Sequence, residues 1–107
     1  MEKREIEKDK NVVLYEFVFD EKEVSELEDA VVIRLNRSMT VPGFRKGKVP
    51  KAVFKMRLGR EFDEYVLEEA TNKILRNMEK EKFFIPPILK DYEFKDNNLI
   101  MKIEVHE

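Results

Sequence analysis

The chain has 107 residues, the length of one domain, and its 42% hydrophobic residues supply a core while 41% charged residues leave an ionic surface. It has no cysteine and one histidine, which excludes disulfides, thiolate nucleophiles and zinc sites made of Cys or His clusters, so we expect no metal and no cofactor. No apolar run approaches the roughly 20 residues of a membrane span, so we expect a cytoplasmic protein without membrane contact.

The first third of the chain is predicted to contain a strand followed by a helix. Residues 1–10 are mostly charged and form either a frayed start or an exposed edge strand. Residues 12–19 are β-branched and aromatic and alternate between two faces, which predicts a strand. Asp20 and Glu23 form a variant of the capping box found at helix starts. A helix to about Arg37 follows, with apolar residues every three or four positions at Val24, Leu27, Val31 and Leu35.

The middle of the chain is predicted to contain two more helices. Pro50 and Gly59 bracket a short helix over residues 51–58, because proline favours a first helical turn and glycine favours a helix end. Three acidic residues then begin a third helix, where carboxylates interact well with free backbone amides. Apolar residues recur in this helix at helical spacing as far as Met78.

The C-terminal part is predicted to form a β-hairpin, and this determines the fold class. Residues 92–95 and 99–105 alternate around the turn sequence Asp96-Asn97-Asn98. Strands at both ends of the chain, with helices between them, predict an α+β domain. Its antiparallel sheet combines the N-terminal strand with the C-terminal hairpin, and three helices pack on one face. We expect residues 1–107 to form a single domain with a protruding basic loop.

The net charge of −2 conceals an uneven distribution of charges. Residues 30–60 contain no acidic residue, although the whole chain has 23. A basic surface on an acidic body suits contact with a polyanionic partner, and the simpler alternative is a solvated basic face. The stretch carries nine basic residues: Arg34, Arg37, Arg45, Lys46, Lys48, Lys51, Lys55, Arg57 and Arg60.

Residues 41–50 read Val-Pro-Gly-Phe-Arg-Lys-Gly-Lys-Val-Pro and are predicted to form a loop with defined turns. Gly43 and Gly47 permit backbone angles that other residues resist, and the flanking prolines limit the freedom of the loop. Between the glycines lies Phe44-Arg45-Lys46. The Arg guanidinium forms bidentate hydrogen bonds with phosphate or carboxylate, and Lys is a mobile point charge. An aromatic ring fills a pocket or stacks on a base. The tip is a candidate recognition site, unless Phe44 folds back into the core and the basic pair only aids solubility.

Catalysis is not expected from these residues. Ser25 and Ser38 are the only serines, and neither lies in the Gly-x-Ser-x-Gly sequence of a nucleophile elbow. His106, next to the last residue, is expected to lie in solvent on the face shared with Glu104 and to matter to no function. Adjacent acidic pairs on helices point in different directions and are far more often solvated than catalytic.

The run from Gly43 to Pro50, between an amphipathic helix and a short helix ending in Arg-Leu-Gly, resembles the trigger factor family of bacterial ribosome-associated chaperones. The resemblance covers the whole chain and is to the N-terminal ribosome-binding domain of that family. It implies docking beside the polypeptide exit tunnel, where Phe44, Arg45 and Lys46 would contact a ribosomal protein and neighbouring ribosomal RNA. Gly43, Gly47 and Pro50 would shape the loop. We further expect supporting basic contacts from Arg37, Lys48 and Lys51.

Three further expectations concern activity and partners. Members of the family continue into a prolyl isomerase domain and a substrate-cradling domain that do not fit within 107 residues, so we expect no isomerase activity. Nascent or unfolded polypeptides would be held weakly, because Val41, Phe44 and either Met39 or Met56 offer a small apolar surface. A weak homodimer is left open. The alternative function is a free-standing RNA-binding module that uses the same basic stretch, with Phe44 stacking on a base.

Overall fold

The structure is a computed structural model that describes residues 1–78 and 87–106. The chain divides into two compact units. The sheet unit comprises residues 1–24 and the described residues from 75 onwards, and the helical unit comprises residues 25–74. The elements are β1 (Glu2–Asp9), β2 (Val12–Phe19), α1 (Glu21–Ser38), α2 (Lys51–Leu58), α3 (Arg60–Asn77), β3 (Ile88–Lys95) and β4 (Asn98–His106).

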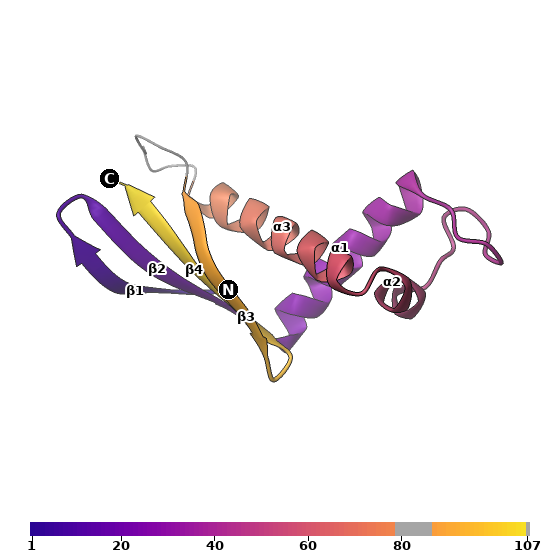
Figure 1. Cartoon of the computed structure of the whole chain (residues 1–107), viewed down its shortest axis with the longest axis horizontal. Helices are drawn as coiled ribbons and strands as arrows, with labels where there is room; N and C mark the ends of the chain where they lie inside the picture. Colours follow the sequence, from indigo (N-terminus) through magenta and orange to yellow (C-terminus); the bar gives the residue numbers. More distant parts are fainter. Residues whose placement is uncertain (79–86, 107) are drawn as a thin grey trace. The chain divides into compact units, whose positions relative to one another are not determined.

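The four strands form one antiparallel sheet in the order β1-β2-β4-β3 (Figure 1). The predicted partnership of the N-terminal strand with the C-terminal hairpin is confirmed, because β2 pairs with β4 along its whole length. Phe17 lies opposite Met101 in this pair, and both side chains are fully buried. Alternate residues of the two strands therefore form one apolar face of the sheet. Its buried members are Val13, Phe17, Phe19, Leu99, Met101, Ile103 and Val105.

The β3–β4 hairpin turns at Asp96 and Asn97, which have φ angles of 52° and 66°. Two central residues with positive φ are typical of the tight turn that matches the twist of antiparallel strands. The strand before this turn begins at Ile88, four residues earlier than the alternation predicts. The reason is a register shift between Leu89 and Asp91, which interrupts the alternation in the sequence without ending the pairing.

The charged N-terminal segment is an edge strand rather than a frayed start. All eight residues of β1 are exposed, and the strand pairs with β2. Arg4 Nη2 donates to Glu16 Oε1 of β2 at 2.8 Å. Charged side chains on an edge discourage pairing with another chain, so this composition suits the outermost position of the sheet. The sheet thus has four strands, one more than the N-terminal strand and hairpin that the sequence predicts.

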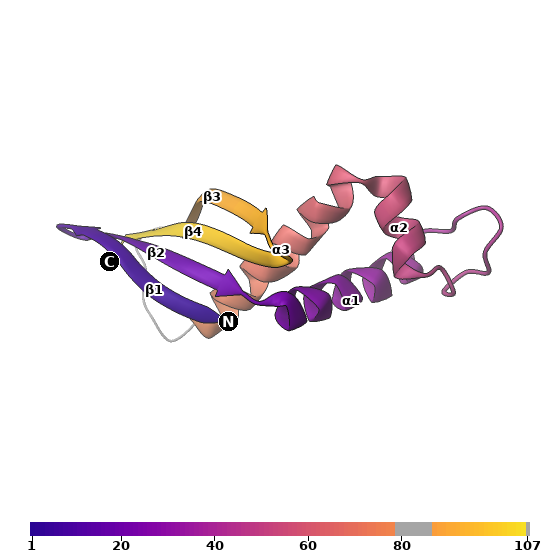
Figure 2. The same ribbon diagram turned by 90° about the horizontal axis from the view of Figure 1, so that it is seen from below.

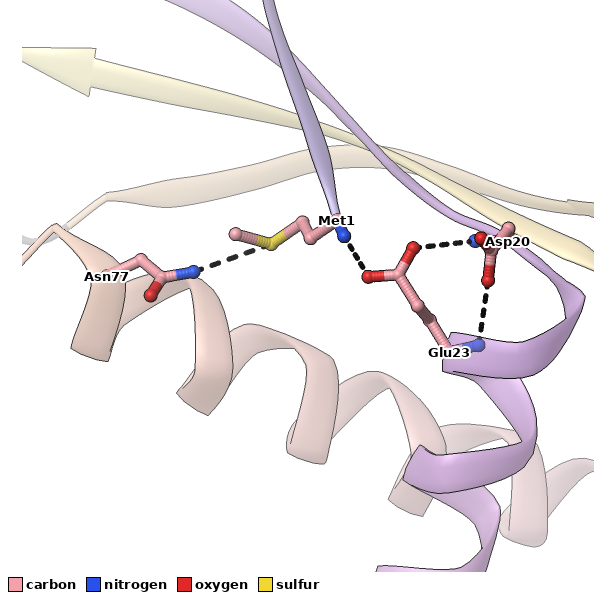
Figure 3. Close-up of polar contacts among 4 residues, drawn as sticks. All are labelled: Met1, Asp20, Glu23 and Asn77. Atoms are coloured by element: carbon pink, nitrogen blue, oxygen red, sulfur yellow. Dashed lines mark hydrogen bonds and ion pairs between the residues drawn. The ribbon is translucent and has the colours of Figure 1, made fainter.

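The start of α1 is the predicted capping box (Figure 3). Glu23 N–H donates to Asp20 Oδ1 at 2.8 Å, and Asp20 N–H donates to Glu23 Oε1 at 3.2 Å. The amino group of Met1 also contacts the Glu23 carboxylate, and Asn77 Nδ2 lies 4.0 Å from the Met1 sulfur. The predicted apolar stripe of α1 is buried, and the helix ends one residue beyond Arg37.

The other two helices also agree with the sequence pattern. Pro50 is the N-cap residue of α2, and the Gly59 N–H donates to the Lys55 carbonyl at 3.0 Å where the helix ends. Gly59 has a φ of 54°, which favours glycine at a helix end. The buried residues of α3 are Phe62, Val66, Leu67, Ala70 and Ile74.

The α+β class and the antiparallel sheet are confirmed. The packing of the helices on the sheet and the projection of the basic loop stay predictions. Within residues 1–78 and 87–106, no helix is long and apolar enough to cross a membrane. The same part of the chain contains no group of three or more His, Asp and Glu side chains able to hold a metal ion.

Candidate functional site

The candidate site is the loop between α1 and α2 (Figure 2). Residues 42–48 are all exposed, whereas the residues on either side of them are buried. Val41 is 5% exposed and Val49 is 2% exposed. The loop is therefore held at both ends by apolar burial while its middle remains available to solvent. The expectation that Val41 offers apolar surface to clients is wrong, because its side chain belongs to the core of the helical unit.

Two consecutive tight turns shape the exposed part of the loop. The Phe44 N–H donates to the Val41 carbonyl at 3.1 Å, and the Lys48 N–H donates to the Arg45 carbonyl at 3.0 Å. Each turn has glycine in third position, with φ of 90° at Gly43 and 84° at Gly47. Positive φ at the third position is the mark of a type II turn, and it explains why the sequence has glycine at both places.

A side chain from α1 holds the far end of the loop. Asn36 Nδ2 donates to the Val49 carbonyl at 3.0 Å, and the Val49 N–H donates to Asn36 Oδ1 at 3.0 Å. The amide thus satisfies both backbone polar groups of a buried residue. Sequence reasoning missed Asn36. The available signal was a polar residue in the last turns of an amphipathic helix, which does not identify a partner 13 residues away.

Phe44 lies outside the buried core and is 42% exposed. The alternative in which its ring folds back into the core is therefore not what the structure has. Arg45 and Lys46 are exposed as well. The three tip residues thus offer an aromatic ring and two cations to a partner, a combination able to bind phosphate or carboxylate groups beside an apolar or stacking contact.

Three of the nine basic residues in the acid-free stretch are neutralised by acids outside it. Arg34 Nη1 lies 3.2 Å from carboxylate oxygens of both Glu68 and Glu69, and its guanidinium lies over the Tyr65 ring. Lys51 and Lys55 pair with Asp29 and Glu28 of α1. Among the described residues no ion pair involves the remaining six, which are Arg37, Arg45, Lys46, Lys48, Arg57 and Arg60.

Lys51 is the predicted supporting residue whose charge is most clearly engaged. Its Nζ lies 2.8 Å from Asp29 Oδ1 and 3.6 Å from Glu28 Oε1, while Lys55 Nζ lies 3.1 Å from Glu28 Oε2. The hydrogen bond to Asp29 is the main reason why the pKa of Lys51 is raised, and burial opposes this effect. These pairs connect α2 to α1 and offset the charge of Lys51, while Arg37 and Lys48 are exposed.

The sequence predicts that the single histidine lies in solvent, whereas in the structure it is only partly exposed. His106 Nε2 lies 2.7 Å from Glu104 Oε1, and its side chain is 31% exposed. Both residues lie on the same face of β4, as predicted, and Lys90 Nζ is 3.5 Å from the other oxygen of Glu104. The hydrogen bond with His106 is the largest cause that lowers the pKa of the Glu104 carboxyl.

The α+β fold carries a glycine-shaped loop that exposes two cations and an aromatic ring, features typical of a recognition loop. Residues 1–106 match the sequence model of the family described as bacterial trigger factor protein (TF). The chain is 43% identical over 107 residues to the trigger factor of Thermotoga petrophila and 37% identical over 106 residues to that of Kosmotoga olearia. It spans 25% and 24% of the lengths of these relatives, which cover 100% and 99% of the chain.

Two solved structures are similar to the chain. One is a trigger factor chaperone studied for promiscuous substrate recognition in folding and assembly, with a TM-score of 0.92 and 43% identity over 100% of this chain and 26% of that one. The other comes from work on domains of the Thermotoga maritima trigger factor, with a TM-score of 0.81 and 44% identity over 90% of this chain and 88% of that one. The chain belongs to the trigger factor family and corresponds to its N-terminal domain.

Proposed function

We propose that the chain is the ribosome-docking module of a cytoplasmic chaperone that assists the early folding of nascent polypeptides. Membership of the trigger factor family supports the chaperone assignment. The single observation that carries docking through the loop is the exposure of residues 42–48 between the buried Val41 and Val49. Such a loop contributes little to the core and presents its side chains to a partner.

In this proposal the loop tip binds near the polypeptide exit tunnel. The Phe44 ring enters an apolar pocket of a ribosomal protein, and Arg45 and Lys46 bind carboxylates of that protein or phosphates of neighbouring ribosomal RNA. Gly43, Gly47 and Pro50 fix the conformation of the loop. Arg37 and Lys48 add cationic contacts beside the tip, and Lys51 adds a smaller one because its charge is offset by Asp29.

Cosedimentation with empty ribosomes tests the proposal. Replacing Phe44, Arg45 and Lys46 together by alanine should abolish binding while the helical circular dichroism stays unchanged. The matched control replaces Lys8 and Lys10 by alanine, which removes the same number of charges from exposed positions outside the loop. Equal loss of binding in both variants would mean that general charge, and not the loop, carries the interaction.

A free-standing RNA-binding module remains the second candidate function. It is favoured by Arg57 and Arg60, which are exposed, lie outside the loop and form no ion pair with any described residue. Naked ribosomal RNA would then bind as tightly as intact ribosomes. A stacking Phe44 would tolerate Tyr or Trp, whereas a ring in a protein pocket would not tolerate a polar change.

The proposal extends to weak contacts with unfolded polypeptides and excludes prolyl isomerisation by this chain. Large apolar side chains exposed in the helical unit are few and include Ile33, Phe44 and Met56, of which Met56 is 79% exposed. We expect this surface to hold clients weakly, so suppression of aggregation at near-equal amounts would contradict it. A weak homodimer is compatible with the proposal, and sedimentation equilibrium would detect it.

A further inference from the structure

Asn36 makes a pair of hydrogen bonds that only an amide side chain provides in this geometry. Its Nδ2 donates to the Val49 carbonyl and its Oδ1 accepts from the Val49 N–H, both at 3.0 Å. A carboxylate only accepts, and an aliphatic side chain does neither. The contact thus has the form of one rung of a β-ladder, made between a helix side chain and a loop backbone.

The position of Val49 explains what this contact controls. Val49 lies three residues after Lys46, and the next residue is Pro50, the N-cap of α2. The two turn hydrogen bonds of the loop join residues 41–48 to one another and therefore fix only its local shape. Among the hydrogen bonds described for residues 25–74, those of Asn36 are the ones in which a helix side chain holds the loop backbone.

We propose that Asn36 is a positioning residue for ribosome binding. Its two hydrogen bonds with Val49 fix the end of the loop to α1. Phe44, Arg45 and Lys46 are thereby held in one arrangement in the unbound chain. This inference rests on the proposed function. A loop that is already ordered in the unbound chain loses less conformational entropy on binding. Loss of the two Asn36 hydrogen bonds should therefore weaken binding by about tenfold without removing any contact with the partner.

The test uses Asn36→Leu, which nearly preserves the size of the side chain but can neither donate nor accept. Ribosome affinity, chemical denaturation and amide hydrogen exchange are measured on the same preparations. We expect about tenfold weaker binding, faster exchange at the Val49 N–H and greater mobility of residues 43–47 by nuclear magnetic resonance. The salt dependence of binding should not change, since no charge is removed.

Two further variants separate positioning from a general effect on the fold. Ser38→Ala removes a hydrogen bond from the Ser38 hydroxyl to the Arg34 carbonyl at the same helix end and should leave affinity and loop mobility unchanged. Asn36→Gln keeps the amide on a longer stem and should recover part of the affinity. Unchanged affinity in Asn36→Leu despite a mobile loop would overturn the proposal, and so would a failure of that variant to fold.

Failure of the proposed function is distinguishable from failure of this inference. If the unaltered chain does not bind ribosomes, docking itself is wrong. The mobility of residues 43–47 in Asn36→Leu still reports whether Asn36 orders the loop. If the unaltered chain binds and the loop of Asn36→Leu stays as rigid as before, the positioning role is wrong while docking stands.

Discussion

Lys51 Nζ lies 2.8 Å from Asp29 Oδ1, so a cation of the acid-free stretch is neutralised by the acid that immediately precedes that stretch. Lys55 with Glu28, and Arg34 with Glu68, repeat this arrangement between helices. Counting charges along the sequence therefore overstates the basic surface. The pairs offset three of the six basic residues that the stretch places on helices and none of the three in the loop, so Arg45 and Lys46 have no ion pair with any described residue at the loop tip.

The first prediction compares two lysines by the salt dependence of ribosome binding. Affinity falls as salt rises, and removing one phosphate contact makes the slope of log affinity against log salt shallower by about 0.7–0.9. We expect a change of this size for Lys46→Ala and little change for Lys51→Ala, whose charge is already offset by Asp29. Dissociation constants across a salt series give both slopes. Equal changes would mean that the pair with Asp29 opens on the ribosome.

The second prediction concerns the stability of the Lys51–Asp29 pair. The pKa of Lys51 is raised in the folded chain, chiefly by its hydrogen bond to Asp29. The stabilisation is therefore fully present below the usual pKa of 10.5 and is lost as the pH rises through the higher folded pKa. Because the lysine side chain is 30% exposed, Lys51→Met should cost less than about 1 kcal/mol at pH 7.

Denaturation of both proteins at several pH values checks this prediction. The difference in unfolding free energy between the chain and Lys51→Met should shrink above the pKa of the lysine. Asp29→Asn is the matched control, because it removes the main cause of the raised pKa and leaves the lysine in place. A difference that persists at high pH would show that the lysine stem stabilises by packing instead of charge.

The third prediction concerns the start of α1. Asp20→Ala removes the side-chain acceptor for the Glu23 N–H and should cost about 1 kcal/mol of unfolding free energy. For a chain of this size that corresponds to a fall in melting temperature of roughly 4–8 °C. Asp20→Asn keeps an acceptor and should lose much less. Thermal unfolding followed by circular dichroism measures both, and equal losses would assign the effect to the charge.

Local features of the fold could be predicted from the sequence, because each depends on neighbouring residues. Asp20 and Glu23 are three residues apart, and the Pro50 and Gly59 that bracket α2 are chain neighbours of the helix they bound. Their chemistry limits the backbone whatever the rest of the chain does. The exposed tip of the candidate site could be predicted for the same reason, since Gly43 and Gly47 determine the turns around it.

The pairing of β2 with β4 could be predicted although the two strands are distant in the chain, because strands at both ends with helices between them favour one sheet. Individual side-chain contacts between distant residues could not be predicted. Asn36 is an unremarked polar residue in an amphipathic pattern until Val49 is folded against it. Arg34 counts as a free cation until α3 brings Glu68 and Glu69 to it. The early start of β3 was hidden because a bulge after Leu89 breaks the alternation on which strand prediction depends.

The fourth prediction tests the backbone of the loop. Gly47 has a φ of 84°, and an added Cβ would meet no atom within 4 Å, so substitution is opposed by backbone conformation and not by crowding. We expect ribosome affinity to fall in the order glycine, Asn, Ala and Val at this position, since Asn tolerates positive φ and Val resists it most. Cosedimentation of Gly47→Asn, Gly47→Ala and Gly47→Val gives the order. Equal affinities would show that the second turn is not needed for docking.

The fifth prediction concerns His106 and Glu104. The hydrogen bond with His106 is the main cause that lowers the pKa of Glu104 below its usual 4.5, and Lys90 contributes less. A lowered carboxyl pKa gives a stabilisation that is present above pH 4.5 and is lost as the pH falls through the folded pKa. In His106→Ala the Glu104 carboxyl should therefore titrate at higher pH, and in Lys90→Ala it should move by a smaller amount.

Nuclear magnetic resonance of the Glu104 side-chain carboxyl during an acid titration measures these shifts directly. Ribosome binding by His106→Ala at neutral pH should equal that of the unaltered chain, because the residues proposed for docking lie in the helical unit and His106 lies in the sheet unit. An unmoved Glu104 titration would show that the 2.7 Å contact is not maintained in solution. Lost binding would instead refute the assignment of recognition to the loop centred on Phe44, Arg45 and Lys46.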